Sequence, residues 1–291
     1  MDNLRAITWM VLAMLGFALT DMFIKLASAS LPVGQIVMIL GGGGAAVFAG
    51  LARARGVPVL APALGSPLVL ARCGLEVLGT LCFTSALALA EISFVSAIQQ
   101  AVPLVVVAGA ALVLGETVGP RRWIAVGVGF AGVLLIVRPS AAGVPAGALL
   151  ALGAVLALAF RDVVTRRIVA EVHTLQLATW GLAVLVPAGL GLLAFTGGFR
   201  SMDAAGTAYC LAGVFTGAGA YYAITASMRI GEVSAVSPFR YTRLLFALVI
   251  GFVVFGERPD ALTLAGAAIV IGSGLFILMR ERALARRARA V

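Results

Sequence analysis

A few polar residues interrupt the long apolar runs of this sequence, and their types suit recognition of charged solutes more than bond-breaking chemistry. Glu76 lies inside one such run, with Thr80 and Phe83 at i+4 and i+7 on the same face of a helix. Ionisable residues within apolar spans are costly and usually face a cavity or a partner. This face predicts either recognition of an ammonium group, or a protonation switch, or a buried ion pair with Arg240 or Arg243.

A second group of polar residues lies in two other apolar runs. Gln99 and Gln100 lie in one of them, and Arg240 and Tyr241 lie in the other. An arginine can hold a carboxylate through two parallel hydrogen bonds, which suits an amino acid as ligand. The alternatives for Arg240 are neutralisation by an acidic residue within the spans, or extension of its side chain to the lipid headgroups. Further candidates for ligand contact are the aromatic residues Phe160, Tyr221, Tyr222 and Phe239.

Proline and glycine residues inside the runs are candidates for hinges or gates. Pro103 and Pro187 each remove a backbone hydrogen bond and can kink a helix. Gly213 and Gly217 are four residues apart, a spacing that lets two helices approach closely. The alternative is that these four residues only fit the helices together.

The scarcity of reactive residues argues against catalysis. Lys25 is the only lysine and follows Ile24, so the sequence has no Gly-Lys-Ser/Thr phosphate loop. The only histidine is His173, which excludes zinc sites built on two histidines. The three cysteines are irregularly spaced within apolar runs and form no disulfide framework or metal pattern. We therefore expect no enzyme activity, no cofactor and no metal.

The elements that carry these residues must lie in a membrane. The chain has 291 residues, of which 62% are hydrophobic and 11% charged, whereas soluble domains carry about 25% charged residues. Each membrane-spanning helix needs about 20 apolar residues. Apolar runs separated by turn residues predict ten such helices, which leaves no room for a separate soluble domain. We place them at 6–27, 34–52, 67–90, 94–114, 122–138, 145–165, 174–195, 205–229, 235–255 and 261–280.

Basic residues indicate the orientation of these spans. Arginines are concentrated on the connections and ends that share one side of the predicted membrane, including the tail 280–291. Because such residues mark the cytoplasmic side, both termini are expected in the cytoplasm. The net charge of +9 is then explained by anionic lipid headgroups and not by nucleic acid. The expected partners are membrane lipids and a small-molecule substrate, and the oligomeric state is left open, a monomer included.

The sequence repeats itself at an offset of 141 residues. The aligned pairs of scarce polar residues are Asp21 and Asp162, Lys25 and Arg166, Gln35 and Gln176, Glu91 and Glu232, and Glu116 and Glu257. Chance seldom aligns so many charged residues at one offset, so we predict a duplication with halves 1–141 and 142–291. Glu76 aligns with Gly217, a departure from symmetry that a residue facing an asymmetric substrate would show.

Each predicted half holds five spans, and five is an odd number. The second half therefore enters the membrane from the opposite side, which makes an inverted-topology repeat. Such repeats are typical of secondary transporters, whose halves tilt around a site between them. The predicted fold is all-α, with ten transmembrane helices arranged as two five-helix inverted repeats around a central cavity. The alternative is that duplication only supplied a stable bundle.

The chain resembles members of the drug/metabolite transporter superfamily that have two EamA-type five-span repeats. The resemblance rests on the residues from Ser96 to Pro103, on Gly115-Glu116 followed by Trp123 to Gly132, and on a weaker copy around Ser237 and Gly256-Glu257. It implies ten spans, export of small metabolites and a central cavity between the halves. Within the superfamily, the chain is most similar to YddG-type exporters of aromatic amino acids.

The combined expectation is a bacterial inner-membrane secondary exporter of small amphipathic metabolites, above all amino acids with apolar or aromatic side chains. One alternative is an exchanger of nucleotide sugars or phosphorylated metabolites from the same superfamily, which would need several cations in its cavity. Another is a membrane scaffold or receptor without transport. The second copy has Leu244 where the first has Pro103, so a hinge at this position is expected in the first half alone.

Polar residues near the ends of spans are expected to be structural. Asp21 and Asp162 are expected to orient Lys25 and Arg166, which lie one helical turn further along. The carboxylates of the two Gly-Glu pairs are expected to lie in solvent where helices terminate. The three tryptophans fall near span ends and are expected in the interfacial belts.

Overall fold

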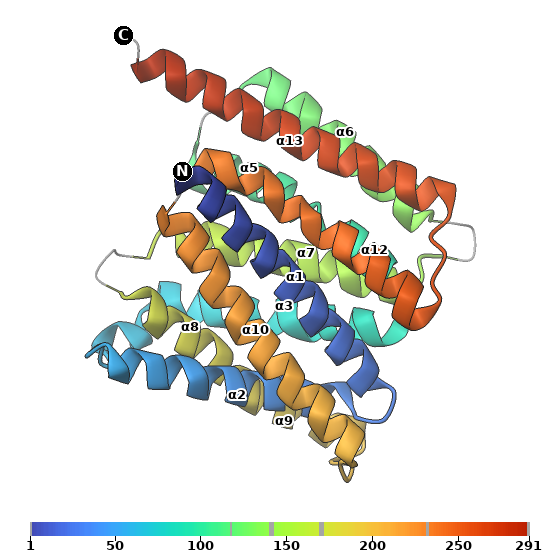
Figure 1. Cartoon of the computed structure of the whole chain (residues 1–291). Helices are drawn as coiled ribbons and strands as arrows, with labels where there is room; N and C mark the ends of the chain where they lie inside the picture. Colours follow the sequence, from blue (N-terminus) through green and yellow to red (C-terminus); the bar gives the residue numbers. More distant parts are fainter. Residues whose placement is uncertain (1, 117, 140–142, 169–171, 231–232, 290–291) are drawn as a thin grey trace. The chain divides into compact units, whose positions relative to one another are not determined.

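The computed structural model describes residues 2–116, 118–139, 143–168, 172–230 and 233–289. Every regular element in these ranges is a helix (Figure 1). The first half of the sequence forms α1 (Asp2–Ser28), α2 (Val33–Ala54), η1 (Pro62–Gly65), α3 (Pro67–Leu89), α4 (Ile92–Gln99), α5 (Val102–Leu114) and α6 (Pro120–Val137). The second half forms α7 (Ala146–Thr165), α8 (Thr174–Ala183), α9 (Leu185–Thr196), α10 (Ala204–Ile230), α11 (Val233–Val236), η2 (Ser237–Tyr241), α12 (Thr242–Phe255) and α13 (Ala261–Arg289).

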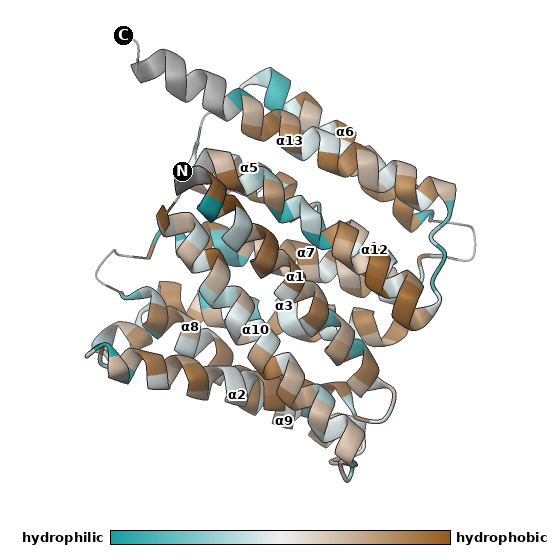
Figure 2. Ribbon diagram, in the orientation of Figure 1, coloured by the Kyte–Doolittle hydropathy of each residue, from teal (hydrophilic) through white to brown (hydrophobic). Residues whose placement is uncertain are grey.

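Nine of the ten predicted spans fall on helical segments that, within the described ranges, are long and apolar enough to cross a membrane. Figure 2 shows hydrophobic residues along the length of the long helices. The remaining predicted span, 205–229, lies within α10, a helix of 27 residues whose glycines, tyrosines and threonines lower its hydropathy. The protein is therefore an all-helical, multi-pass membrane protein.

The helices group into two compact units, and neither unit is one half of the sequence. The first unit comprises Met1–Ala18, Glu91–Pro145 and Gly219–Val291, and the second comprises Leu19–Ala90 and Ala146–Ala218. Both copies of the sequence repeat therefore contribute helices to each unit. The helices α1 and α10 contribute to both units because the boundaries fall within them.

In the first unit, α6 packs against α13, its equivalent under the 141-residue offset. Glycines bring the two backbones together, since a Cβ on Gly132 would lie 2.9 Å from the carbonyl oxygen of Gly266. A Cβ on Gly266 would lie 2.6 Å from the carbonyl oxygen of Gly132. Gly129, which precedes Gly132 in α6, faces Ser273, which follows Gly266 in α13. The two equivalent helices therefore run in opposite directions.

The second unit shows the same relation between α2 and its equivalent, the segment formed by α8 and α9. A Cβ on Gly34, at the start of α2, would lie 2.6 Å from the carbonyl oxygen of Gly189 in α9. Gly44, further along α2, faces Leu182 in the preceding helix α8. Equivalent helices are thus antiparallel in both units, as a repeat of five spans requires.

One predicted span in each half is broken into two helices at the same repeat position. In the first half, α4 ends at Gln99, and Pro103 lies in the first turn of α5. In the second half, η2 ends at Tyr241 and α12 follows directly. Pro238 lies in the first turn of η2. Although Leu244 stands where the first half has Pro103, the second half also has a break at this repeat position, beside Pro238, and a one-sided hinge movement stays a prediction.

Glu257 is buried, which corrects the expectation of a solvated carboxylate after Gly256. Only 6% of the residue is exposed, and its carboxylate accepts hydrogen bonds from the backbone N–H of Ile92 at 2.8 Å and of Ser93 at 3.0 Å. The hydroxyl of Ser93 donates a third, at 2.7 Å. These N–H groups belong to the first turn of α4, where a helix has unsatisfied donors and favours an anion. Glu257 therefore joins the end of α12 to the start of α4.

Trp180 has a role other than the one expected, and Lys25 contacts the end of α3, while its orientation by Asp21 stays a prediction. Trp180 is 4% exposed, and its indole N–H donates to the carbonyl of Val59 at 2.7 Å, so its assignment to an interfacial belt is wrong. The ammonium group of Lys25 donates to the carbonyls of Leu87 and Ala90 at the end of α3. A lysine at this position donates hydrogen bonds to carbonyl groups that have no N–H partner within the helix.

Candidate functional site

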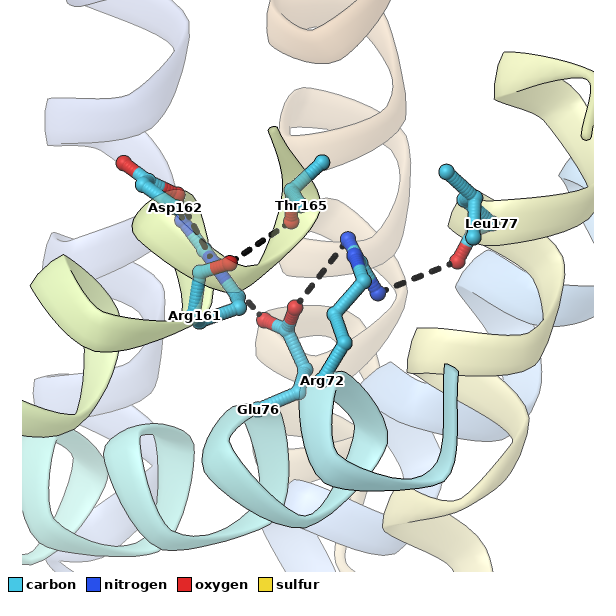
Figure 3. Close-up of polar contacts among 6 residues, drawn as sticks. All are labelled: Arg72, Glu76, Arg161, Asp162, Thr165 and Leu177. Atoms are coloured by element: carbon cyan, nitrogen blue, oxygen red, sulfur yellow. Dashed lines mark hydrogen bonds and ion pairs between the residues drawn. The ribbon is translucent and has the colours of Figure 1, made fainter. Parts of the chain in front are cut away.

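A cluster of four charged side chains in the second unit is the candidate functional site (Figure 3). Arg72 and Glu76 come from α3, and Arg161 and Asp162 come from α7. Nη1 of Arg161 donates to Oε1 of Glu76 at 2.9 Å. Nη2 of Arg72 lies 3.5 Å from Oε2 of the same carboxylate. Glu76 is thus held between two guanidinium groups.

Arg161 is the centre of this cluster, because it also pairs with Asp162. Its Nε and Nη2 donate to Oδ1 of Asp162 at 3.0 and 2.8 Å. The hydroxyl of Thr165 donates to the backbone carbonyl of Arg161 at 2.7 Å. The exposed fraction of the side chain is 24% for Arg161 and 38% for Asp162, against 13% for Glu76. The α7 side of the cluster is therefore its more accessible side.

Arg72 lies on the side of the cluster that faces α8, and only part of its guanidinium group makes hydrogen bonds. Its Nη1 donates to the carbonyl of Leu177 in α8 at 3.3 Å. Its Nε is buried and has no hydrogen-bond partner among the described residues. A Cβ on Gly181 would lie 2.6 Å from Nη1 of Arg72. A glycine at this point of α8 therefore makes room for the guanidinium.

The cluster forms where α3 and α7 pack closely and in opposite directions. A Cβ on Gly79 would lie 2.6 Å from Cδ2 of Leu158, and a Cβ on Gly147 would lie 2.8 Å from that of Ala90. Small residues permit such close approach of membrane helices. The antiparallel contact brings Glu76, one turn before Gly79, against Arg161, one turn after Leu158.

The predicted partners of Glu76 were the wrong arginines. Arg240 and Arg243 belong to the first unit, where Arg240 is exposed and the guanidinium of Arg243 lies 5.4 Å from the centre of the Phe17 ring. Glu76 is ion-paired with Arg161 and Arg72, while ammonium recognition and a protonation switch at this residue stay predictions. Asp162 likewise pairs with its neighbour Arg161 and not with the expected Arg166.

The repeat places an uncharged contact where the cluster has its central ion pair. Under the 141-residue offset, Arg161 corresponds to Thr20 and Glu76 to Gly217. A Cβ on Gly217 would lie 3.5 Å from Oγ1 of Thr20, so the corresponding positions are also neighbours in space. The hydroxyl of Thr20 lies 2.9 Å from that of Thr216, in hydrogen-bond contact. The helix pair α1–α10 is thus the counterpart of α3–α7, with Asp21 in place of Asp162 and no charged equivalent of Glu76 or Arg161.

The predicted polar residues of the first unit lie at its broken helices. Oε1 of Gln99, Oγ of Ser96 and the hydroxyl of Tyr241 are buried without a hydrogen-bond partner among the described residues. The amide of Gln100 donates to the carbonyl of Ser96. Tyr241 is 7% exposed, and a Cβ on Gly274 would overlap its hydroxyl oxygen. These groups form a second polar region, in a unit separate from that of the charged cluster.

The remaining predicted residues are distributed over both units. Tyr222 is 51% exposed and contacts Trp9 edge-on, with ring centres 6.0 Å apart. Phe239 packs against the apolar cluster of α1. Partly buried positions without an assigned ligand role are Thr80, Phe83, Phe160 and Tyr221. Ligand contact by all of these residues stays a prediction.

The predicted hinge residues lie at helix breaks or helix contacts. Pro187 is in the first turn of α9, directly after the break between α8 and α9. Pro103 likewise lies in the first turn of α5, after the break between α4 and α5. A Cβ on Gly213 would lie 3.1 Å from the side chain of Leu40 in α2, and Gly217 faces Thr20. Their movement as hinges or gates stays a prediction.

Sequence reasoning missed Arg72, Arg161 and Asp162 as members of the candidate site. The sequence predicts a structural role for Asp162, and neither Arg72 nor Arg161 is among the predicted site residues. A signal was available, because Arg161 and Asp162 are adjacent charges inside a predicted span, where such residues usually serve a function. Their contact with Glu76 depends on the register of α3 against α7, which the sequence alone does not give.

Comparison with known families and proteins agrees with the repeat. Residues 4–138 and 145–279 each match the EamA-like transporter family. A solved crystal structure with 20% sequence identity aligns with a TM-score of 0.64 over 94% of this chain and 98% of the other, a likeness of fold.

Several named relatives are transporters. A riboflavin transporter of Rhizobium johnstonii is 30% identical over 213 residues, covering 73% of this chain and 70% of the relative. An S-adenosylmethionine uptake transporter of Rickettsia prowazekii is 23% identical over 208 residues, covering 70% and 69%. The pseudopaline exporter CntI of Pseudomonas aeruginosa is 28% identical over 271 residues, covering 90% and 91%.

Proposed function

Since the chain belongs to the EamA-like transporter family, we propose that it moves small amphipathic metabolites across the bacterial inner membrane by alternating access. The observation that carries this proposal is the antiparallel packing of equivalent helices, α6 with α13 and α2 with α8–α9. Inverted repeats give a transporter two arrangements of similar energy that open a site to opposite sides of the membrane. Broken helices at equivalent positions of the two halves fit the same function, because discontinuous helices commonly form such sites.

The proposed substrates are amino acids with apolar or aromatic side chains and similar compounds. The charged cluster supplies groups of both signs, and apolar helices surround it. A phosphorylated substrate is less favoured, because Glu76 and Asp162 already match the charges of Arg72 and Arg161. The named relatives transport riboflavin, S-adenosylmethionine and pseudopaline, so the amino-acid assignment stands on the chemistry of the cluster.

The proposed direction is export. Of the three relatives named above, the pseudopaline exporter shares the longest aligned stretch with this chain, while the S-adenosylmethionine transporter works in uptake. The proposed orientation has both termini in the cytoplasm, on the strength of the arginine distribution. Reporter fusions at residue 291 and in the connection near Arg200 test it, and signals on the opposite sides from those proposed would contradict it.

Flux into proteoliposomes tests the proposed function. The purified chain is reconstituted, and exchange of labelled phenylalanine, leucine, riboflavin and S-adenosylmethionine is measured against protein-free vesicles. We expect protein-dependent exchange of at least one apolar amino acid. Exchange of riboflavin or S-adenosylmethionine alone would contradict the substrate class, and no protein-dependent flux of any solute would contradict transport of these metabolites.

A further inference from the structure

We infer that Arg161 and Asp162 bind the head group of a dipolar solute, one that carries an ammonium and a carboxylate on the same carbon. The pair would discriminate against solutes that carry only one of these charges. This inference rests on the proposed transport function and adds to it the residues that select the substrate's charge.

Asp162 has capacity for a further hydrogen bond. Both bonds from Arg161 reach the same oxygen, Oδ1. Among the described residues, no contact of the other carboxylate oxygen is found. The Asp162 side chain is also the most exposed of the four charged groups, at 38%. A substrate ammonium can therefore approach Asp162 without displacing a buried residue.

Arg161 would take the carboxylate of the same solute. It is fixed from the other side by Glu76 at 2.9 Å, and that bond uses Nη1 alone. The Nε and Nη2 donors that now face Asp162 form the fork that binds a carboxylate through two bonds. On binding, the pair opens and each member takes the opposite charge of the solute. Glu76 is then a positioning residue, which keeps Arg161 in place while its other partner changes.

Charge balance explains why a dipolar solute would be preferred. The cluster contains two cations and two anions, all within membrane-spanning helices. A solute with no net charge leaves the site neutral after binding. An amine or a carboxylic acid alone would leave one uncompensated charge in a medium where such a charge is costly.

The counterpart of the cluster in α1 and α10 supports a role of the Glu76–Arg161 ion pair in recognition over a role in holding helices together. At the corresponding position, the hydroxyl groups of Thr20 and Thr216 are in contact. Asp162 recurs as the buried Asp21, but Glu76 and Arg161 have no charged equivalent. Equivalent helices can thus pack here without this ion pair, and a pair present in one half only is what an asymmetric solute requires.

Ligand-induced thermal stabilisation of the purified full-length chain tests this inference. The ligands are phenylalanine, 2-phenylethylamine and 3-phenylpropanoate, which share a ring and chain but differ in charge. A ligand that binds only the folded protein raises its melting temperature. We expect phenylalanine to act at a concentration about tenfold lower than either analogue, a difference of about 1.4 kcal/mol.

Asp162→Asn is the diagnostic variant, and Glu91→Gln is its control, since Glu91 is exposed and makes no side-chain cap bond. In the first variant, phenylalanine should act no better than 3-phenylpropanoate, while the control keeps the wild-type ratio. A purely structural role for Asp162 would lower the melting temperature and leave the ratio unchanged, which would overturn the inference.

The wild-type protein alone also decides the matter if the variant does not fold. Equal effects of the three ligands, or no effect of any of them, would overturn the inference. The flux panel above tests transport separately. Selectivity can therefore fail while protein-dependent flux of other solutes persists, and the two failures are distinguishable.

Discussion

The helix pairs α3–α7 and α1–α10 are related by the internal repeat, yet they differ in chemistry. The first pair is joined by Glu76 and Arg161 at 2.9 Å, with a second arginine and an aspartate attached. The second pair has a hydroxyl contact of 2.9 Å between Thr20 and Thr216 at the corresponding position. The repeat has preserved the helix contact and the aspartate, which recurs as Asp21, but it has Gly217 and Thr20 where the cluster has Glu76 and Arg161.

This difference distinguishes the side chains that helix packing requires from those that binding of a solute would require. Two helices can meet at this position through Gly217 and Thr20, so the ion pair of Glu76 and Arg161 is not required for packing. An isolated charge in a membrane costs several kcal/mol, and a charge cluster is retained only with a compensating role. The α3–α7 contact is therefore the region in which function is to be sought.

The largest effect is expected from removing the carboxylate that the two arginines share. Glu76→Gln leaves Arg72 without an ionic partner and gives the cluster a net positive charge. Breaking a largely buried pair in this way should cost about 3 kcal/mol. Denaturant unfolding in mixed micelles would measure the loss, and reconstituted vesicles should show flux reduced to near background.

Restoring charge balance provides the control for that variant. The double variant Glu76→Gln with Arg161→Met keeps one cation and one anion, and should recover more than half of the lost stability without recovering flux. Equal stability of the single variant and the wild type would show that Glu76 is not part of a buried ionic cluster.

A smaller effect is expected for Glu257, whose carboxylate accepts hydrogen bonds from uncharged groups at the start of α4. Glu257→Gln replaces an oxygen that accepts bonds from Ile92 and Ser93 with an amide that cannot accept them all. The expected cost is about 1–3 kcal/mol, because buried donors lose an acceptor. Thermal unfolding measures it, with the exposed Glu91→Gln as matched control. A solvated carboxylate at this position would make the two variants equal.

The helix pair α1–α10 should tolerate loss of the hydrogen bond between Thr20 and Thr216. Thr216→Val keeps the shape of the side chain and removes the bond to Thr20. Hydrogen bonds between membrane helices are worth about 0.6 kcal/mol on average, so the expected loss of stability is of that order. Unfolding in mixed micelles would detect it. A loss as large as that of Glu76→Gln would remove the contrast between the two helix pairs.

The smallest effect is expected for an exposed ion pair between Arg138 and Asp260, which follow α6 and precede α13. The Arg138 guanidinium lowers the pKa of Asp260 below its ordinary value. The charged carboxylate therefore stabilises the fold at neutral pH, and this contribution is lost as the pH falls through the acidic range. Melting temperatures of the wild type and Asp260→Asn should differ slightly at pH 7 and converge in acid. Divergence in acid would contradict the sign.

The spans could be predicted from the sequence because a membrane-spanning helix requires a continuous run of apolar residues. The duplication was also readable, since scarce residues such as Asp21 and Asp162 recur at one offset. The grouping of helices into two units, each with helices from both halves, could not be predicted, because it depends on packing between segments distant in the sequence. The break between η2 and α12 was not predicted, because Leu244 stands at the position aligned with Pro103 and the proline near the break, Pro238, lies earlier in the chain.

The candidate site was predicted in part. Glu76 could be predicted as a site residue because a carboxylate within a membrane span is costly and usually has a functional role. Its partner Arg161 lies 85 positions further along the chain, and several arginines were available to the sequence argument. Glu257 was misjudged because its position after a glycine suggested solvent, whereas the start of α4 covers it. Such contacts depend on three-dimensional register, which a single sequence does not contain.

The most direct measurement is a comparison of ligand charge selectivity between variants of the two helix pairs. The ratio of effective concentrations for phenylalanine and 3-phenylpropanoate would be determined in Asp162→Asn and in Thr216→Val. We predict that the ratio collapses to about one in the first variant and stays near tenfold in the second. Equal ratios in the two variants would contradict the assignment of charge recognition to α3 and α7.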